Sequence, residues 1–227
     1  MTQVKLLYDF GTESSHIHLA RAALLLSHCP EGYKREQQSD RAWLGAAIQN
    51  AQSAGAHRVW QRSCPAQDVR VRSDEQRAKR RIWICCVVRD RIMALTSRRS
   101  LLIPETYLDE GCRELVAADL SVEVSGSLVV SVGGKRRDGE VFLRLVDLCL
   151  VVTELVGLRY PDVRGKGCCY GQSSVEDVDA KLHKWYRSAV IKFPELESGA
   201  ALASVVAAGS MGESVSPHSA RLYLLYQ

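Results

Sequence analysis

The chain has 227 residues, of which 46% are hydrophobic and 25% are charged, and its formal net charge is +4. Such a composition is typical of a globular protein with enough apolar side chains for one substantial core. The sequence pI is about 8.6, whereas domains built around phosphate contacts commonly have a pI above about 9. We therefore predict one domain over residues 1–227, and bulk charge gives no support to direct binding of nucleic acid.

The first two predicted helices cover residues 16–28 and the stretch RAWLGAAIQNAQSAG that begins at Arg41. Pro30 ends the first helix, and Gly55 ends the second because glycine readily adopts the left-handed backbone conformation at a helix end. The residues expected on the buried faces recur at helical spacing: Leu19, Ala22, Ala23 and Leu26 in the first helix, and Trp43, Leu44, Ala47, Ile48 and Ala51 in the second.

A third helix is predicted from Ser73 to about Leu95. Ser73 and Gln76 have the spacing of a capping box, in which two side chains satisfy free backbone amides at the start of a helix. One side of this helix is expected to face the core and carries Ala78, Ile82, Cys85, Cys86, Arg89 and Met93. Because Asp90 and several arginines lie beside this apolar stripe, we predict that these charges form ion pairs.

The sequence SVEVSGSLVVSV favours a small β-hairpin near residues 121–132, since β-branched residues alternate around a central serine and glycine. A basic turn from Lys135 to Asp138 is predicted next. It is followed by a helix over residues 140–158, which Arg144 and two acidic residues make too polar for a membrane span. The residues after Met1 lack the apolar stretch of a signal peptide.

The last complete helix is predicted over residues 177–191, ending before Pro194. Its expected inward residues are Val178, Leu182, Trp185 and Ala189. A further helix begins near Ala220 and is not completed before Gln227. We therefore expect a helical domain that is incomplete at its C-terminus.

No metal or cofactor site is predicted in this chain. Among eight cysteines, none has the C-x-x-C spacing from which zinc sites are commonly built. The adjacent pairs Cys85-Cys86 and Cys168-Cys169 point in different directions on regular backbone, which disfavours a shared metal. Free cysteine behaves as a small apolar residue, so we expect reduced thiols in a reducing compartment.

No catalytic residue is predicted, because the sequence contains neither a complete phosphate-binding loop nor a G-x-S-x-G nucleophile elbow. His57 has two interpretations: a ligand or acid–base group, or a side chain that fixes a helix end by hydrogen bonding, which is favoured. Lys135, Arg136 and Arg137 are a candidate nuclear import signal or DNA contact, against the alternative of solvated surface charge. A second basic cluster, at 77–81, lies in a helix that needs some of its charges for packing.

Two sequence motifs, which we call the family words, occur in a fixed order along the chain and indicate a family. The words W-L-G-x-A-I-x-x-A-x-x-x-G-x-H-R, at Trp43 to Arg58, and R-R-I-W-x-x-C-x-x-R-D-R-x-x-A-L-x-x-R-R, at Arg80 to Arg99, resemble the middle homology region of fungal-specific zinc-cluster transcription factors, most of all the cutinase-regulator type. Weaker likeness covers nearly the whole chain and includes Leu182 to Trp185. The residues that match the family words and are expected to have structural roles are Trp43, Leu44, Gly45, Gly55, His57, Arg58, Arg81, Trp83, Arg89, Asp90 and Arg91.

The resemblance implies an all-α, irregular multi-helix regulatory domain in a nuclear regulator of transcription. It also implies partners in the transcription machinery or a full-length relative, and contact with DNA only indirectly or through a zinc cluster absent from this chain. Zinc is expected only in that cluster. The sequence departs from the family where Ile84 follows Trp83 and where Gly111 and Cys112 replace the usual Val-Pro.

Two other functions stay open at this point. The chain could be a stand-alone protein-interaction module without DNA binding. It could also be a helical sensor that binds a small-molecule effector between the Trp43 and Trp83 helices. An enzyme is not predicted, because no nucleophile, base or cofactor motif can be named.

Overall fold

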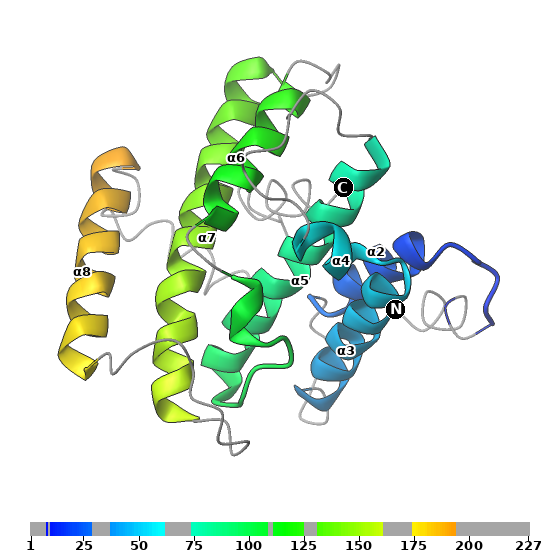
Figure 1. Ribbon diagram of the computed structural model, residues 1–227, viewed down its shortest axis with the longest axis horizontal. Helices are drawn as coiled ribbons and strands as arrows, with labels where there is room; N and C mark the ends of the chain where they lie inside the picture. The colour runs from blue at the N-terminus through cyan, green and yellow to red at the C-terminus, as the bar shows by residue number, and fades with distance from the viewer. Residues whose placement is uncertain are drawn as a thin grey trace, which may run out of the picture. The chain divides into compact units, whose positions relative to one another are not determined.

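The computed structural model describes residues 8, 10–28, 37–61, 74–108, 111–124, 131–160 and 174–193 (Figure 1). Within these ranges the secondary structure consists of seven α-helices and a short 3-10 helix, without a strand. The predicted all-α, irregular multi-helix fold is confirmed. The helix predicted to begin near Ala220 and the capping residue Ser73 lie outside the described residues.

The chain divides into two compact units, the first comprising Met1–Glu123 and the second beginning at Val124. The sequence predicts one domain over residues 1–227. The boundary between Glu123 and Val124 comes from the structure alone. Each unit has its own helices and its own buried side chains, and each is described separately below.

The first unit is built around α5, the helix over Asp74–Ser97. Helix α5 packs most extensively against α2, α3 and α4, and α2 packs along α3 (Figure 1). The other elements of this unit are α2 (His16–Leu26), α3 (Gln37–Ser53), α4 (Ala56–Gln61), the 3-10 helix η2 (Glu105–Tyr107) and α6 (Gly111–Glu123).

Helix α5 is buried over its whole circumference for two turns, since residues 82–88 are all buried. We predicted a one-sided apolar stripe on this helix, and that prediction was too narrow. A helix that is apolar on all sides belongs in the centre of a domain, because each face must be covered by a neighbour. The sequence ICCVV, which follows Trp83, meets this requirement.

The predicted inner face of α3 is confirmed for Leu44, Ala47, Ile48 and Ala51, which are buried. The end of α3 is confirmed as well, since Gly55 has a φ of +74°. The chain then enters helix α4 directly. His57 and Arg58 therefore lie in a second short helix.

The β-hairpin predicted near residues 121–132 was wrong at both ends. Residues 121–123 are the last turn of α6, and Val132 is the first residue of α7. Residues 125–130 lie outside the described residues. Three residues of α6, Cys112, Leu115 and Val116, are buried at helical spacing, so the buried face of this helix outweighs the strand preference of its β-branched end.

The second unit contains α7 (Val132–Arg159) and α8 (Val175–Lys192), which pack against each other. The Lys181 ammonium lies 2.6 Å from a Glu154 carboxylate oxygen, and the Trp185 indole Nε1 donates to the Arg144 carbonyl at 2.9 Å. The basic turn predicted at 135–138 was wrong, because these residues belong to α7. The start of their helix is capped by Ser131, whose hydroxyl accepts a hydrogen bond from the Gly134 amide.

Helix α8 begins with a capping box formed by Ser174 and Asp177, which stabilises the exposed start of the helix. Val178 and Ala189 are buried, as predicted. Leu182 was also predicted to face inward, and this was wrong, since 38% of its surface is exposed. Among the described residues, no helix is both long and apolar enough to cross a membrane.

Two glycines of the family words differ in the conformation that they require. Gly55 has a positive φ, whereas Gly45 lies inside α3 with no atom within 4 Å of a Cβ built there. We expect Gly55→Ala to lower the free energy of unfolding by about 1 kcal/mol, because a side chain is strained at positive φ. Gly45→Ala should raise it by about 0.5–1 kcal/mol, since alanine favours a helix.

Urea denaturation of the two variants beside the unchanged chain measures both effects. Equal and similarly large losses of stability in both variants would contradict this assignment.

Candidate functional site

The centre of the first unit holds a buried carboxylate, that of Asp90 on α5. Its side chain is 1% exposed, and its two oxygens accept hydrogen bonds from the backbone amides of Leu102 and Ile103 at 2.9–3.1 Å. These amides belong to the segment after α5, residues 100–104, which carries no helix of its own. Asp90 therefore holds this segment against the helix that precedes it.

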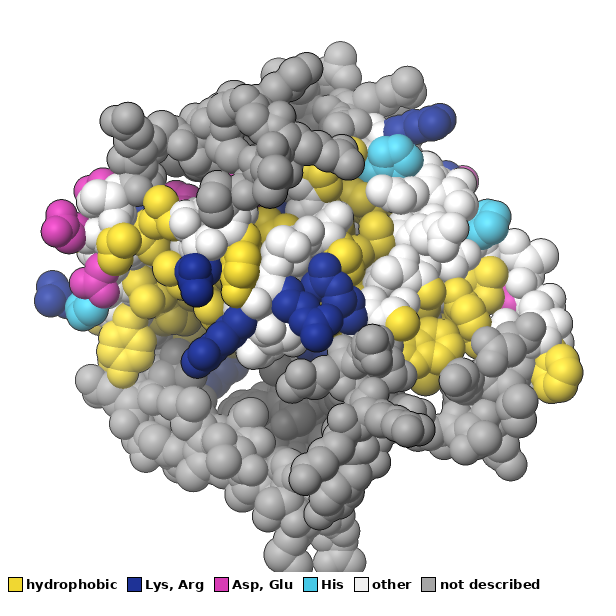
Figure 2. Space-filling model, turned by 90° about the horizontal axis from the view of Figure 1, so that it is seen from below, with side chains coloured by type: hydrophobic (Ala, Val, Ile, Leu, Met, Phe, Trp, Pro, Cys, Tyr) yellow, Lys and Arg dark blue, Asp and Glu magenta, His cyan; other side chains and the backbone are white. Residues whose placement is uncertain are grey.

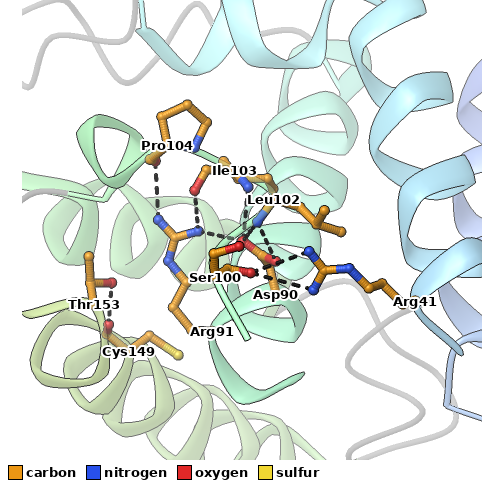
Figure 3. Close-up of polar contacts among 9 residues, drawn as sticks. All are labelled: Arg41, Asp90, Arg91, Ser100, Leu102, Ile103, Pro104, Cys149 and Thr153. Atoms are coloured by element: carbon orange, nitrogen blue, oxygen red, sulfur yellow. Dashed lines mark hydrogen bonds and ion pairs between the residues drawn. The ribbon is translucent and has the colours of Figure 1, made fainter. Parts of the chain in front are cut away.

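Arg91, the next residue of α5, completes the arrangement and is fully buried. One guanidinium nitrogen lies 2.9 Å from a carboxylate oxygen of Asp90 and also donates to the Ile103 carbonyl at 2.9 Å. The other donates to the Pro104 carbonyl at 3.1 Å. We call Asp90, Arg91 and residues 100–104 the Asp90 network (Figure 3). The predicted pairing of the buried charges on α5 is confirmed here.

Arg41 of α3 reaches the same segment from the other side, and its guanidinium donates to the Ser100 carbonyl at 3.4 Å (Figure 3). Burial raises the pKa of Asp90, while the positive charge of Arg91 and the two backbone amides oppose this rise. A carboxylate in this position is costly to desolvate, so its partners must be held in place for the pair to be tolerated.

A second cluster surrounds Trp83, which is completely buried on α5. Its ring centroid lies 5.1 Å from that of Tyr107 in an edge-on arrangement, and 5.8 Å from that of His57. Trp60 of α4 is also buried and donates its indole N–H to the Tyr107 carbonyl at 2.9 Å. The aromatic rings thus join α4, α5 and η2, and such edge-on contacts add to the energy of apolar burial.

His57 is held by ring packing. Its Nδ1 atom is buried and, in the part of the chain that the structure describes, has no hydrogen-bond partner. The prediction that His57 fixes a helix end by hydrogen bonding is therefore not met at this atom. Burial and the adjacent charge of Arg58 lower the pKa of His57, which favours the neutral ring. Trp83 Nε1 is likewise buried without a partner among the described residues.

Two further arginines of α5 connect it to other helices. Arg80, which is 2% exposed, donates through two nitrogens to the Asp119 carboxylate of α6 at 2.6 and 2.8 Å. Arg89 donates to the backbone carbonyl of Ser27, directly after α2, and to its hydroxyl at 3.3 Å. A cation at this position also interacts favourably with the negative end of the α2 dipole.

The other predicted residues lie apart from these clusters. Trp43 packs edge-on against Tyr8 with the ring centroids 5.1 Å apart. Arg58 is exposed on α4 and Arg81 is half-buried on α5. The candidate import residues are in the first turns of α7, where Arg136 and Arg137 are exposed and Lys135 is half-buried.

The side chains of these clusters hold the helices of the first unit to one another and to the segment after α5. Burial raises the pKa of Cys85 to about 12 and that of Cys86 well above its ordinary value, so both thiols are protonated and unreactive at pH 7. Within the described ranges, no group of three His, Cys, Asp or Glu side chains is arranged to hold a metal ion.

Sequence reasoning missed four residues that complete the clusters: Arg41, Trp60, Tyr107 and Asp119. Each lies in a different element from the residue that it contacts. The sequence predicts the role of Asp119 only weakly. Asp119 follows the buried Leu115 and Val116 at helical spacing, and an acidic residue there can pair with a buried arginine. The sequence contains no comparable signal for Arg41.

The residues that form both clusters fall within one family match. The model of the fungal specific transcription factor domain matches residues 2–123, which is more than half of the chain and coincides with the first compact unit, Met1–Glu123. The chain belongs to this family. No solved structure shows a significant match to it.

Two curated relatives of this domain are transcription factors. The chain is 28% identical over 168 residues to "Cutinase transcription factor 1 beta" of Fusarium vanettenii, a match that covers 70% of this chain and 18% of that protein. It is 25% identical over 251 aligned positions to a "Transcription factor" of Fusarium pseudograminearum (strain CS3096), with 99% of this chain and 27% of that protein covered. The chain thus spans less than a third of either relative.

The resemblance to this family that the sequence indicated, including its cutinase-regulator type, is confirmed. The alternative of a small-molecule sensor is not favoured. It placed a pocket between the Trp43 and Trp83 helices, whereas the family match and both named relatives are those of transcription factors.

The buried charge pair of this domain yields a stability prediction. We expect Asp90→Asn to lower the free energy of unfolding by about 3–5 kcal/mol, because the buried Arg91 charge loses its partner. Asp74→Asn is the matched control: Asp74 pairs with Arg77 on the exposed start of α5, where such a pair is worth about 0.2–1 kcal/mol. Urea denaturation compares the two. Similar losses in both variants would contradict the role given to Asp90.

His28 yields a prediction of pH dependence. Burial, together with the positive charge of Arg89, lowers the pKa of His28 from 6.5 to about 4. Between these values the unfolded chain binds a proton that the folded chain does not, so stability is complete above pH 6.5 and falls as the pH drops towards 4. At about 1.36 kcal/mol per pKa unit, the loss is roughly 3 kcal/mol.

We therefore expect His28→Gln to show a shallower loss of stability between pH 7 and pH 4 than the unchanged chain, by that amount. The exposed His183 provides the control His183→Gln, which should retain the full loss. Parallel curves for all three proteins in urea denaturation at several pH values would refute the assignment.

Proposed function

We propose that this chain acts in the regulation of transcription in a fungus, as a regulatory domain that works through contacts with other proteins. The observation that carries the proposal is the coincidence of the family match at residues 2–123 with a compact unit at Met1–Glu123. The proposal is also supported by the two named relatives, which are transcription factors. The activity of those longer proteins extends to this chain only as part of the proposal.

The charge and ring clusters support a role as a scaffold for protein contacts. Three polar side chains of the family words, Asp90, Arg91 and Arg89, are directed at backbone or at one another inside the first unit. These three are used within the domain, whereas Arg58 of the same words is exposed on α4. Partners in the transcription machinery, or a full-length relative, are proposed, and DNA would be reached through them or through another part of a longer protein.

The proposal assigns neither a catalytic residue nor a cofactor to this chain, and places it in the nucleus. The import residues proposed are Lys135, Arg136 and Arg137. Exposure of Arg136 and Arg137 on α7 is compatible with recognition by an import receptor. A small-molecule effector, in this proposal, would act by changing the contact between the domain and its protein partners.

A tethering experiment tests the regulatory role. The 227-residue chain is fused to a bacterial DNA-binding domain and expressed in a fungal cell that carries a reporter gene behind the matching operator. We expect the fusion to change reporter transcription relative to the DNA-binding domain alone, because tethering supplies the DNA contact and leaves partner contact to the chain.

Asp74→Asn is the folded control and should keep the effect, while Asp90→Asn should weaken it by destabilising the domain. Fusions are compared at equal nuclear abundance, measured by immunofluorescence. An unchanged reporter at equal abundance of the folded fusion would contradict the proposal.

A further inference from the structure

Helix α5 ends in a turn that carries two arginines and leads into Ser100. Arg98 has a φ of +52°, and the Arg99 amide donates to the Ala94 carbonyl at 3.0 Å, so the helix ends in a left-handed turn. Among the residues that the structure describes, Arg98 is the one residue other than glycine with a positive φ. Because glycine avoids the strain of this conformation, an arginine here suggests a use for its side chain.

Ser100 follows this turn directly and is accessible to an enzyme. Arg98, Arg99 and Ser100 are all exposed, and residues 99–101 belong to no helix. The end of α5 and the start of α3 lie towards the bottom of Figure 1. Figure 2 shows the molecule from below, with lysine and arginine side chains in the middle of the view and acidic side chains towards its edges. The serine is thus exposed in an irregular segment, beside two positive charges.

Arg41 of α3 approaches Ser100 from the other side without a strong acceptor. Both of its terminal guanidinium nitrogens lie 3.4 Å from the Ser100 carbonyl oxygen (Figure 3), whereas N–H···O distances are commonly about 2.9–3.0 Å. Arg41 also interacts electrostatically with the Asp90 carboxylate, which is already paired with Arg91 at 2.9 Å. Because Arg41 is half-buried, water would screen a charged acceptor beside it only in part.

From this geometry we infer that Ser100 is a phosphorylation site whose phosphate binds the Arg41 guanidinium. Protein kinases select substrates in part by the charges beside the serine, and Arg98 and Arg99 supply two such charges. The γ-phosphoryl group of a nucleoside triphosphate passes to Ser100 Oγ. The bond between the γ-phosphorus and the bridging oxygen of the leaving diphosphate breaks, a phosphorus–Oγ bond forms, and the hydroxyl proton goes to a base of the kinase.

Phosphorylation supplies the acceptor that Arg41 lacks. A phosphoserine carries a charge of about −1.5 to −2 at pH 7 and three acceptor oxygens, and a guanidinium can bind two such oxygens at once. Arg41 is within reach, since it already contacts the carbonyl of the same residue. The modification therefore ties α3 to the segment after α5, which the Asp90 network holds. This inference concerns the first unit and does not depend on the proposed role in transcription.

Mass spectrometry of the 227-residue chain, expressed in a fungal cell and purified, tests the modification. We expect phosphate on Ser100, which Ser100→Ala removes, and a several-fold lower phosphorylated fraction in Arg98→Ala, because the kinase loses a charge that it reads. Arg58→Ala is the matched control, since it removes an exposed arginine from α4, and it should keep the full fraction. An unphosphorylated Ser100 would overturn the inference, and so would equal fractions in Arg98→Ala and Arg58→Ala.

Phosphorus-31 NMR tests the contact with Arg41, with phosphoserine placed at position 100 by genetic code expansion. The second pKa of phosphoserine is about 6, and a guanidinium in contact lowers it by favouring the doubly charged form. We expect a lower titration midpoint in the folded chain than in urea. Arg41→Gln, with folding checked by circular dichroism, should raise that midpoint, and Arg58→Ala should not. Equal midpoints in the folded and unfolded chains, or no change in Arg41→Gln, would overturn the inference.

Discussion

The first unit depends on one buried ion pair, that of Asp90 and Arg91. Removing two charges from water costs several kcal/mol for each, and the cost is tolerated only when the remaining hydrogen-bonding capacity is filled. Here it is filled by backbone groups of one segment, with two amides on the carboxylate and two carbonyls on the guanidinium. The segment after α5 therefore has one fixed conformation. This conformation places Tyr107, which follows it, against the ring of Trp83.

The same principle extends along α5. Arg80 is paired with Asp119 of α6, and Arg89 with the end of α2. An arginine has five donors in a fixed plane, so each such contact sets an orientation as well as a distance. A helix that is apolar on every side can slide or rotate among apolar neighbours. Its charged side chains supply the contacts that specify one arrangement, and four residues of the family words are these points of attachment: Arg80, Arg89, Asp90 and Arg91.

How far the sequence predicted this structure differs from element to element. The period of α3, its end at Gly55 and the pairing of Asp90 were predictable, because each follows from local spacing or from the cost of an unpaired buried charge. The hairpin near residues 121–132 and the inward position of Leu182 were wrong, since both depend on what covers a residue and not on its own preference. Arg41, Trp60 and Asp119 escaped notice because their partners lie 39 to 59 residues away.

Amide hydrogen exchange at Leu102 and Ile103 tests the central role of the buried pair most directly. Both amides lie outside any helix, and an amide in an irregular segment ordinarily exchanges fast. If Asp90 holds this segment, the two amides exchange as slowly as those of the core residues 82–88 of α5, and Asp90→Asn accelerates them more than it accelerates the amides of α7. Exchange of Leu102 and Ile103 at the rate of exposed backbone in the unchanged chain would contradict the account.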